Sequence, residues 1–320
     1  MSRFLVVRAL TLTAGLLLAS LIVFAALRLL PGDVAQVLGG TTASPEQVAQ
    51  LREELGLDRP ILVQYTDWIG GIFTGNLGDS IVSGNSISAE LAEKAQVTVP
   101  LTLYSLLVAL ALALPLGVLA AYRRRALPSR VLSVVGVGAA AVPIVWAGML
   151  GTIVFSVWLG WLPAQGFPRA GWDDPLAAIR SLTLPALTIG LVVGAILFRF
   201  VRSATLDALR AEHVRTAMSQ GYSRLGALVR HGLPGVGLSV VSLLGLQIAE
   251  LLVGAVVIEQ LFNLPGLGRM LVSDVDNRDL IKVQSTLFVL TAVILILGAL
   301  IDVLHRLIDP RLRVESEDER

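Results

Sequence analysis

The chain has 320 residues, of which 55% are hydrophobic and 15% are charged, and its formal net charge is +1. A soluble domain usually carries about 25% charged residues, so this composition indicates a protein that is partly solvated by lipid. The small net charge argues against a nucleic-acid partner, and the absence of cysteine excludes disulfides, zinc–thiolate sites and cysteine-ligated iron–sulfur clusters.

Six apolar stretches are long enough to cross the hydrocarbon core of a bilayer, which takes about 20 residues. Each is expected to be helical, because lipid offers no hydrogen-bond partner to an open backbone. The expected fold class is therefore an all-α integral membrane protein with six transmembrane helices. The expected spans are residues 9–30, 98–121, 132–158, 182–201, 236–258 and 285–305.

The first stretch follows Arg3 and Arg8 and has two interpretations. It could be a cleaved signal peptide, but its apolar core of about 20 residues exceeds the 7–15 residues that are usual there. We therefore expect residues 1–30 to hold a cytoplasmic N-terminus and a retained first transmembrane helix.

The basic residues predict the orientation of the chain. With a cytoplasmic N-terminus, 16 of the 25 Lys and Arg residues fall in segments on the inside. Cytoplasmic loops are enriched in Lys and Arg, so both termini are expected in the cytoplasm, with the chain in a bacterial inner membrane. The 16 residues are Arg3, Arg8, Arg123, Arg124, Arg125, Arg130, Arg199, Arg202, Arg210, Arg215, Arg224, Arg230, Arg306, Arg311, Arg313 and Arg320.

The first outer loop, residues 31–97, is far longer than a typical connection. A helix is expected over 45–55, because Ser44 can cap it and Pro45 suits its first turn. We expect this loop to form an extracytoplasmic subdomain. A disordered linker is the alternative, but such a segment usually lacks apolar and aromatic anchors. The anchors here are Ile61, Leu62, Tyr65, Trp68 and Phe73.

Residues 202–235 are too polar to span a membrane. Leu206, Leu209 and Val214 recur at near-helical spacing among charged residues, which predicts an amphipathic helix. Gly221 is expected to end it, and a second short helix is expected over 223–231. Such a helix–turn–helix could lie on a lipid surface or dock in a groove of a partner, and the residues alone favour neither.

The same segment resembles the cytoplasmic signature of permease subunits of binding-protein-dependent ABC importers. That signature reads Glu-Ala-Ala, three residues, Gly, nine residues and then Ile-x-Leu-Pro. Here the spacing is kept throughout, while Arg, Thr and His replace Glu, the first Ala and Ile. The run that begins at Glu212 is similar to the variant of the dipeptide, oligopeptide and nickel branch. The matched positions are Arg215, Thr216, Ala217, Gly221, His231, Leu233 and Pro234.

Further segments resemble the same branch in the same order along the chain. They occur after the first span, in the long outer loop, after the fifth span and before the last one. They are Leu29–Asp33, Leu55–Pro60, Gly75–Ser80, Glu259–Gly268 and Asp279–Gln284.

The resemblance implies a type I ABC importer permease fold. It implies a five-helix core over 98–308, a cytoplasmic coupling loop over 202–235 and a cytoplasmic tail over 309–320. The implied partners are a homologous second permease, one or two ATP-binding cassette subunits, an extracytoplasmic solute-binding protein and membrane lipid. The implied cargo is a di- or oligopeptide, with nickel or another small solute as the alternative. The implied coupling residues are Glu212, Arg215, Thr216, Ala217, Gly221, Leu233 and Pro234.

The chain shows no pattern for hydrolysing ATP itself. A Walker A loop needs a lysine after a glycine, and neither Lys94 nor Lys282 follows one. We therefore expect no enzyme activity and no cofactor in this chain, with ATP and magnesium bound at partner ATPase subunits. A stand-alone secondary transporter is the competing class, but such folds usually show paired broken helices in two similar halves.

Glu250 is the one acidic residue well inside an expected span. A charge inside a membrane is costly, and such residues usually face a cavity or a partner. Glu250 is thus expected either to line the translocation pathway or to pair with a polar group of the second permease.

Overall fold

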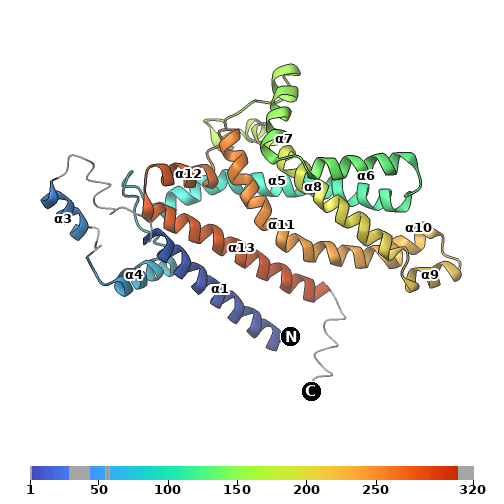
Figure 1. Ribbon diagram of the computed structural model, residues 1–320, viewed down its shortest axis with the longest axis horizontal. Coiled ribbons are helices and arrows are strands. Elements are labelled where there is room, and N and C mark those ends of the chain that lie inside the picture. The colour runs from blue at the N-terminus through green and yellow to red at the C-terminus, as the bar shows by residue number, and fades with distance from the viewer. Residues whose placement is uncertain (1, 29–43, 55, 57, 309–320) are drawn as a thin grey trace. The chain divides into compact units, whose positions relative to one another are not determined.

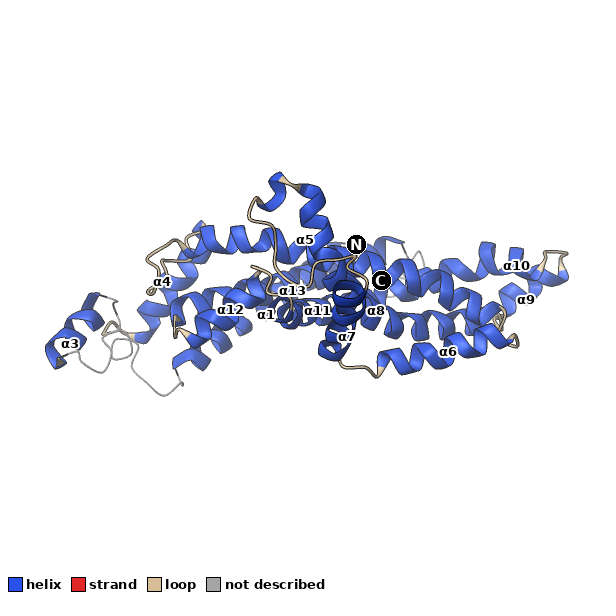
Figure 2. Ribbon diagram, turned by 90° about the horizontal axis from the view of Figure 1, so that it is seen from above, coloured by secondary structure: helices blue, strands red, loops and turns tan. Residues whose placement is uncertain are grey.

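The computed structural model describes residues 2–28, 44–54, 56 and 58–308. Within these ranges the chain forms helices and loops without any β-strand, as Figure 2 shows, which confirms the expected all-α class. The helices belong to two compact units. One comprises residues 97–268 and 297–308, and the other comprises residues 2–96 and 269–296, so α5 and α13 each contribute to both.

Five described helices are long and apolar enough to cross a membrane, which confirms five of the six expected spans. Most extend beyond the expected limits, because a helix can continue past the hydrocarbon core into the headgroup layer. Their bounds are α1 Ser2–Arg28, α5 Ile87–Tyr122, α8 Pro175–Ala208, α11 Leu233–Leu261 with the short α10 Arg224–Ala227 before it, and α13 Leu280–Ile308.

The remaining expected span, over 132–158, is present as a bent pair of helices, and the described residues hold six candidate spans if the pair counts as one. α6 (Leu127–Ala140) ends and α7 (Ile144–Gly151) starts after a bend of 108°, continuing as a π-helical turn over Thr152–Trp158. Pro143 explains the break, because it has no amide hydrogen to donate and disfavours helical geometry in the preceding residue. Here Pro143 stands at the N-cap of α7 in a non-helical conformation, at φ −59° and ψ 137°. Figure 1 shows α7 turning away from α6.

The first unit is built around α8. Asp174 accepts a hydrogen bond from the Ala177 amide and Pro175 follows, which starts the helix. α6, α7 and α11 all pack on α8. Glycine lets α5 approach it closely, because a Cβ on Gly190 would lie 2.7 Å from the Val108 side chain. The fully buried side chains include Leu101, Leu182, Ile189, Leu197, Leu251, Ile258 and Phe262.

The second unit holds α1, α3 (Pro45–Glu54), α4 (Ile61–Thr74) and most of α12 (Leu267–Asp276), with the adjoining parts of α5 and α13. Four aromatic rings form its centre, which we name the aromatic cluster: Phe24 of α1, Tyr65 and Trp68 of α4, and Phe288 of α13. Phe24 lies 5.2 Å from Tyr65 and Trp68 lies 5.5 Å from Phe288, measured between ring centroids. Such edge-to-face pairs add about 0.5–1.5 kcal/mol beyond the area they bury.

A buried ion cluster lies in the same unit. The Lys282 ammonium is 2.5 Å from the Glu90 carboxylate and 3.0 Å from that of Asp274. Burial raises the pKa of the Asp274 carboxyl, and the hydrogen bond from Lys282 works against that rise. Removing one member of such a cluster usually costs about 3–5 kcal/mol, because it leaves a buried charge uncompensated. The cluster therefore holds α5, α12 and α13 together within this unit.

α3 confirms the helix expected over 45–55, whereas α4 and α12 are helices that the sequence reading left as loop. The subdomain expected over 31–97 stays a prediction, and its last residues belong to α5 in the structure. The Leu29–Asp33 run and the tail after residue 308 lie outside the described residues.

Candidate coupling site

The segment expected to couple the chain to an ATPase forms a compact helical hairpin. α8 ends at Ala208, and α9 (Glu212–Ser219) follows after a tight turn in which the Ala211 amide donates to the Asp207 carbonyl. Val214 and Ala217 of α9 are buried against Ala227 of α10. The helix–turn–helix is confirmed, although its first helix is restricted to 212–219 because the preceding residues extend α8.

Gly221 forms the turn between the two short helices with φ +99°, a conformation that residues with a side chain rarely adopt. The Tyr222 amide donates to the Ala217 carbonyl and the Gly221 amide donates to the Met218 carbonyl. This pair of bonds is the Schellman motif, which satisfies the last carbonyls of a helix. Ser223 then caps α10 by accepting from the Gly226 amide at 3.1 Å.

The hairpin is joined to the start of α11. A π-helical turn over Leu228–Gly232 leads directly into α11, where Pro234 occupies the first turn. His213 Nε2 lies 3.1 Å from the His231 carbonyl, and the Tyr222 ring packs edge-on against the His231 ring. A displacement of α9 would therefore be transmitted to the inner end of α11.

The predicted coupling residues divide into two groups. Glu212, Arg215, Thr216 and Gly221 are exposed, and so is Pro234. Ala217 is only 4% exposed and packs inward, and Leu233 packs against the cluster of Val201, Val236 and Val240. Sequence reasoning missed three exposed apolar residues beside them. Their spacing of three and four positions could have indicated one face of a helix. They are Tyr222, Leu225 and Val229.

Comparison with known proteins decides the family. Residues 113–314 match the family "Binding-protein-dependent transport system inner membrane component", and residues 1–101 match the N-terminal part described for such membrane components. The chain belongs to this family.

Curated relatives cover nearly the whole permease. A Brucella abortus (strain 2308) protein, provisionally named a peptide transport system permease protein, is 38% identical over 94% of this chain and 95% of its own length. The glutathione transport system permease protein GsiC of Salmonella typhimurium (strain LT2) is 36% identical over 96% of this chain and 97% of its own length. The family implies, in general, a binding protein and a partner ATPase.

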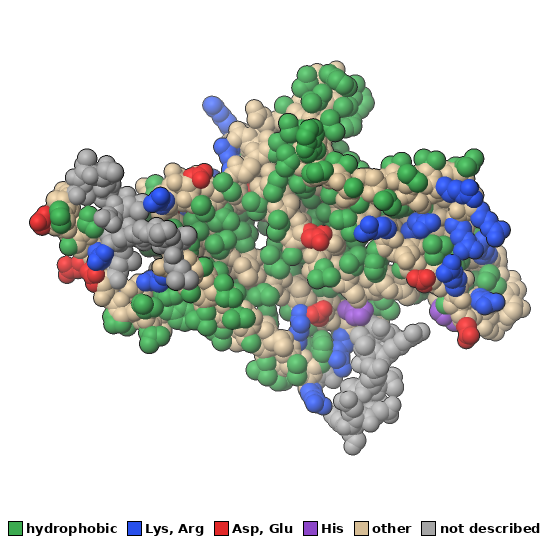
Figure 3. All heavy atoms as spheres, in the orientation of Figure 1, with side chains coloured by type: hydrophobic (Ala, Val, Ile, Leu, Met, Phe, Trp, Pro, Cys, Tyr) green, Lys and Arg blue, Asp and Glu red, His purple; other side chains and the backbone are tan. Residues whose placement is uncertain are grey.

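Basic side chains surround the coupling hairpin of this permease. Figure 3 shows them gathered over α6, α9 and α10. The Arg224 guanidinium lies 5.1 Å from the centre of the Tyr122 ring, so the end of α5 is beside α10. The arginine-rich turn after α5 and the hairpin therefore lie on one side of the unit. The exposed arginines are Arg123, Arg124, Arg125, Arg130, Arg215, Arg224 and Arg230.

A groove of about 510 Å³ lies directly beside the hairpin. Its walls come from the inner part of α8, including Ser203 and Asp207, from His213 of α9, and from Gly232 and Ser239 near the start of α11. The groove thus lies along the surface where α8 and α11 pack together next to the hairpin.

Glu250 lies on α11 and its side chain is exposed on the isolated permease. The amide of Gln247, one helical turn earlier, donates to its carboxylate at 2.9 Å. Gln247 itself is only 3% exposed, so it orients the Glu250 carboxylate from the buried side of the helix. The structure therefore places an oriented carboxyl group on the exposed surface of a candidate spanning helix.

Glu259, at the other end of α11, is a fully buried acid to which sequence reasoning gave no role. It accepts from the Thr98 hydroxyl at 2.5 Å and from the Gly268 amide at 2.7 Å. A Cβ on Gly266 would overlap the Glu259 carboxylate, so the loop can close over it only with glycine there. The segment 259–268 resembles the family, but its sequence does not predict that Glu259 accepts a hydrogen bond from Thr98.

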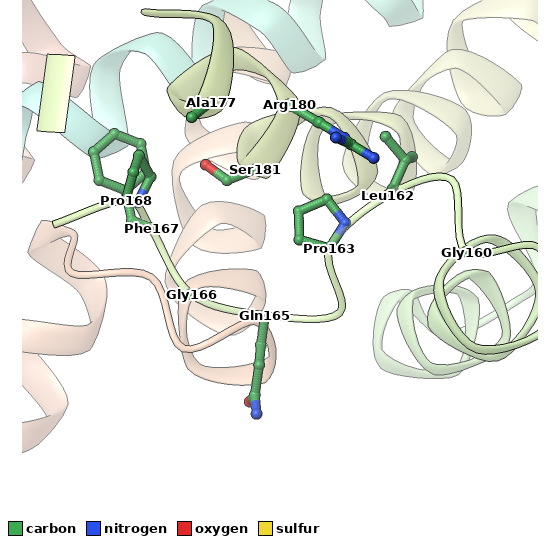
Figure 4. A pocket seen from close by; sticks show the side chains of 10 residues that line it. All are labelled: Gly160, Leu162, Pro163, Gln165, Gly166, Phe167, Pro168, Ala177, Arg180 and Ser181. Atoms are coloured by element: carbon green, nitrogen blue, oxygen red, sulfur yellow. The ribbon is translucent and has the colours of Figure 1, made fainter. Parts of the chain in front are cut away.

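A second cavity, of about 550 Å³, lies between the loop 160–168 and the start of α8. Figure 4 shows that Gln165 points away from it, while Arg180 and Ser181 lie along its wall. The Arg180 guanidinium donates to the Trp161 carbonyl at 2.9 Å and so holds the loop in place. The Ser181 hydroxyl donates to the Ala178 carbonyl of its own helix. Arg180 and Ser181 therefore form hydrogen bonds within the loop and helix that make up this wall.

Proposed function

We propose that the chain is the permease subunit of an ABC importer that forms the translocation pathway for di- or oligopeptides delivered by an extracytoplasmic binding protein. The observation that carries the proposal is the rigid α9–α10 hairpin on the inner ends of α8 and α11, in a chain of this family. The names of the relatives, which refer to peptide and glutathione transport, support the peptide class.

The hairpin acts as the coupling element. Its exposed face, with Glu212, Arg215 and Thr216, seats in a cleft of an ATP-binding cassette subunit. Because Val214 and Ala217 are buried against α10, the hairpin moves as one body when its partner moves. ATP and magnesium are bound by one or two partner ATPase subunits, and this chain holds no cofactor and no ATPase site of its own.

The transport cycle follows from that connection. ATP binding closes the ATPase pair and draws its hairpins inward, so that this permease and a homologous second permease open the pathway to the outside. The binding protein then releases its solute, and hydrolysis resets the complex. The inward end is cytoplasmic in a bacterial inner membrane, with both chain termini on that side, which the arginines around the hairpin support.

Glu250 lines the pathway in this proposal. Its carboxylate is exposed and oriented by Gln247, and it meets the protonated amine of a passing peptide. A hydrogen bond to a charged group contributes about 1.5–3 kcal/mol, enough to guide a solute without trapping it.

Uptake by a strain that lacks this gene tests the substrate class. Labelled dipeptides, labelled oligopeptides and radioactive nickel are supplied separately, with and without the gene restored. Loss of peptide uptake with unchanged nickel uptake is the expected result, and restoring the gene should restore it. Unchanged peptide uptake together with lost nickel uptake would assign the permease to metal import instead.

A further inference from the structure

α4 has more apolar surface than its own unit covers. At 3.6 residues per turn, all of its apolar side chains except Val63 fill an arc of about 140°, from Trp68 through Tyr65 to Phe73. Tyr65 and Trp68, at one edge of the arc, pack in the aromatic cluster. At the other edge Leu62 is 76% exposed and Phe73 is 85% exposed. Half of the arc therefore has no covering protein among the residues that the structure describes.

Contacts with α1 fix the depth of α4 relative to that spanning helix. The Tyr65 hydroxyl is 2.7 Å from the Ser20 hydroxyl, and the Arg28 guanidinium at the end of α1 donates to Gln64. Ser20 lies two turns before Arg28, which is about 12 Å along the helix axis. α4 thus lies beside the last two turns of α1.

Contacts with α13 give the same depth independently. The Trp68 indole N–H donates to the Ser285 hydroxyl at 3.4 Å, and the Trp68 ring packs on Phe288. Both residues lie in the first three turns of α13, which starts at Leu280. Two spanning helices therefore hold α4 slightly inside their ends, at the level where headgroups meet acyl chains.

The opposite side of α4 is suited to water. Asp67 forms an exposed ion pair with Arg59 at 2.6 Å, and Thr74 is exposed near the C-terminal end. The spanning helix α1, on which α4 packs, likewise has exposed apolar side chains, which include Leu21 and Ile22. This division of polar and apolar sides is typical of a helix that lies in the membrane interface.

We propose that α4 is an interfacial helix of the outer leaflet, with Leu62 and Phe73 buried among lipid acyl chains. Lipid is the occupant because α4 packs on two candidate spanning helices, α1 and α13, whose contacts hold it at the depth of the acyl boundary. The inference goes beyond the proposed function, since it depends on where the helix lies and not on what is transported. It implies that the outer loop is held against the bilayer and does not extend freely into the extracytoplasmic space.

Spin-label accessibility in the complete transporter tests the proposal. This chain has no cysteine, so Phe73→Cys, Leu62→Cys and the matched control Thr74→Cys each give one label on this subunit. The unsubstituted complex supplies the labelling background. In lipid nanodiscs, collision rates are measured with oxygen, which concentrates in lipid, and with a water-soluble nickel chelate. The expected ratio of oxygen to nickel-chelate accessibility is above one at positions 73 and 62 and below one at position 74.

Two results would overturn the proposal. If the labels at 73 and 62 are as accessible to the nickel chelate as the label at 74, the edge faces water. If they are protected from both reagents, a protein partner covers it. Neither result depends on peptide transport, so a failure here is separate from a failure of the proposed function.

Discussion

Glu250 and Glu259 lie on one helix, yet their surroundings give the two carboxylates different roles. Glu259 is fully buried and bonded to Thr98 and to the Gly268 amide, so it closes a loop over the end of α11. Glu250 is exposed, and its carboxylate accepts a hydrogen bond from the Gln247 side-chain amide. The first carboxylate therefore has a structural role, whereas the second is the one that the proposed function assigns to the pathway.

Replacing Glu250 by glutamine should lower transport of peptides with a free amine by about tenfold or more. The reason is that a hydrogen bond to a charged group contributes about 1.5–3 kcal/mol and each 1.4 kcal/mol is a factor of ten. Uptake of N-acetylated peptides should change little, and copurification of the partner subunits should stay at the level of the unsubstituted chain. Equal uptake of free and acetylated peptides by Glu250→Gln and by the unsubstituted chain would remove Glu250 from the pathway.

For single residues, the sequence shows which side chains are present in a segment but not which distant residues they contact. Glu250 can be found by searching an apolar span for an acid. The burial of Glu259 depends on Thr98, which is far away in the sequence, so no local pattern predicts it. Similarly, Lys282 could be counted, but its pairing with Glu90 and Asp274 requires three helices to meet.

The coupling hairpin is the element on which the proposed mechanism depends. Its turn relies on the left-handed conformation of Gly221 and on the two Schellman hydrogen bonds. A side chain in that conformation costs about 1–2 kcal/mol, which is enough to distort a turn of two short helices without unfolding the long ones.

Gly221→Val should therefore leave the complex assembled while the amount of solute transported per ATP hydrolysed falls several-fold. Gly235→Val is a matched control, because Gly235 has no positive φ and open space around its Cβ. Both variants are compared in proteoliposomes by measuring uptake and phosphate release together. A ratio for Gly221→Val that equals the ratio for the control would show that the turn geometry is irrelevant to coupling.

The helices differ in how well the local sequence pattern predicts them. The spacing of apolar residues and Gly221 predicted the hairpin, since both signals are local. The same approach missed α4 and interpreted its aromatic residues only as anchors of a loop. It also could not tell which of the seven apolar residues on one face of that helix meet protein and which meet lipid. The span over 132–158 is present as a bent pair with Pro143 at the N-cap of α7, but hydropathy alone does not give its bend of 108°.

On the scale of the whole molecule, a permease of this family is one part of a larger machine. The chain supplies candidate spanning helices and a short helical hairpin between α8 and α11. The expected all-α fold and the family followed from composition and from short motifs spread along the chain. The arrangement of the helices could not be predicted in the same way, because it depends on packing between distant segments such as Gly190 against Val108.

Reconstitution of the purified chain tests the central claim, that transport is driven through the hairpin by a separate ATPase. Accumulation of a labelled dipeptide is measured in liposomes that contain the chain alone, and in liposomes with the second permease, the ATPase subunits and the binding protein. We predict accumulation only in the complete complex and only with ATP. Strong ATP-independent accumulation by the chain alone would contradict the account.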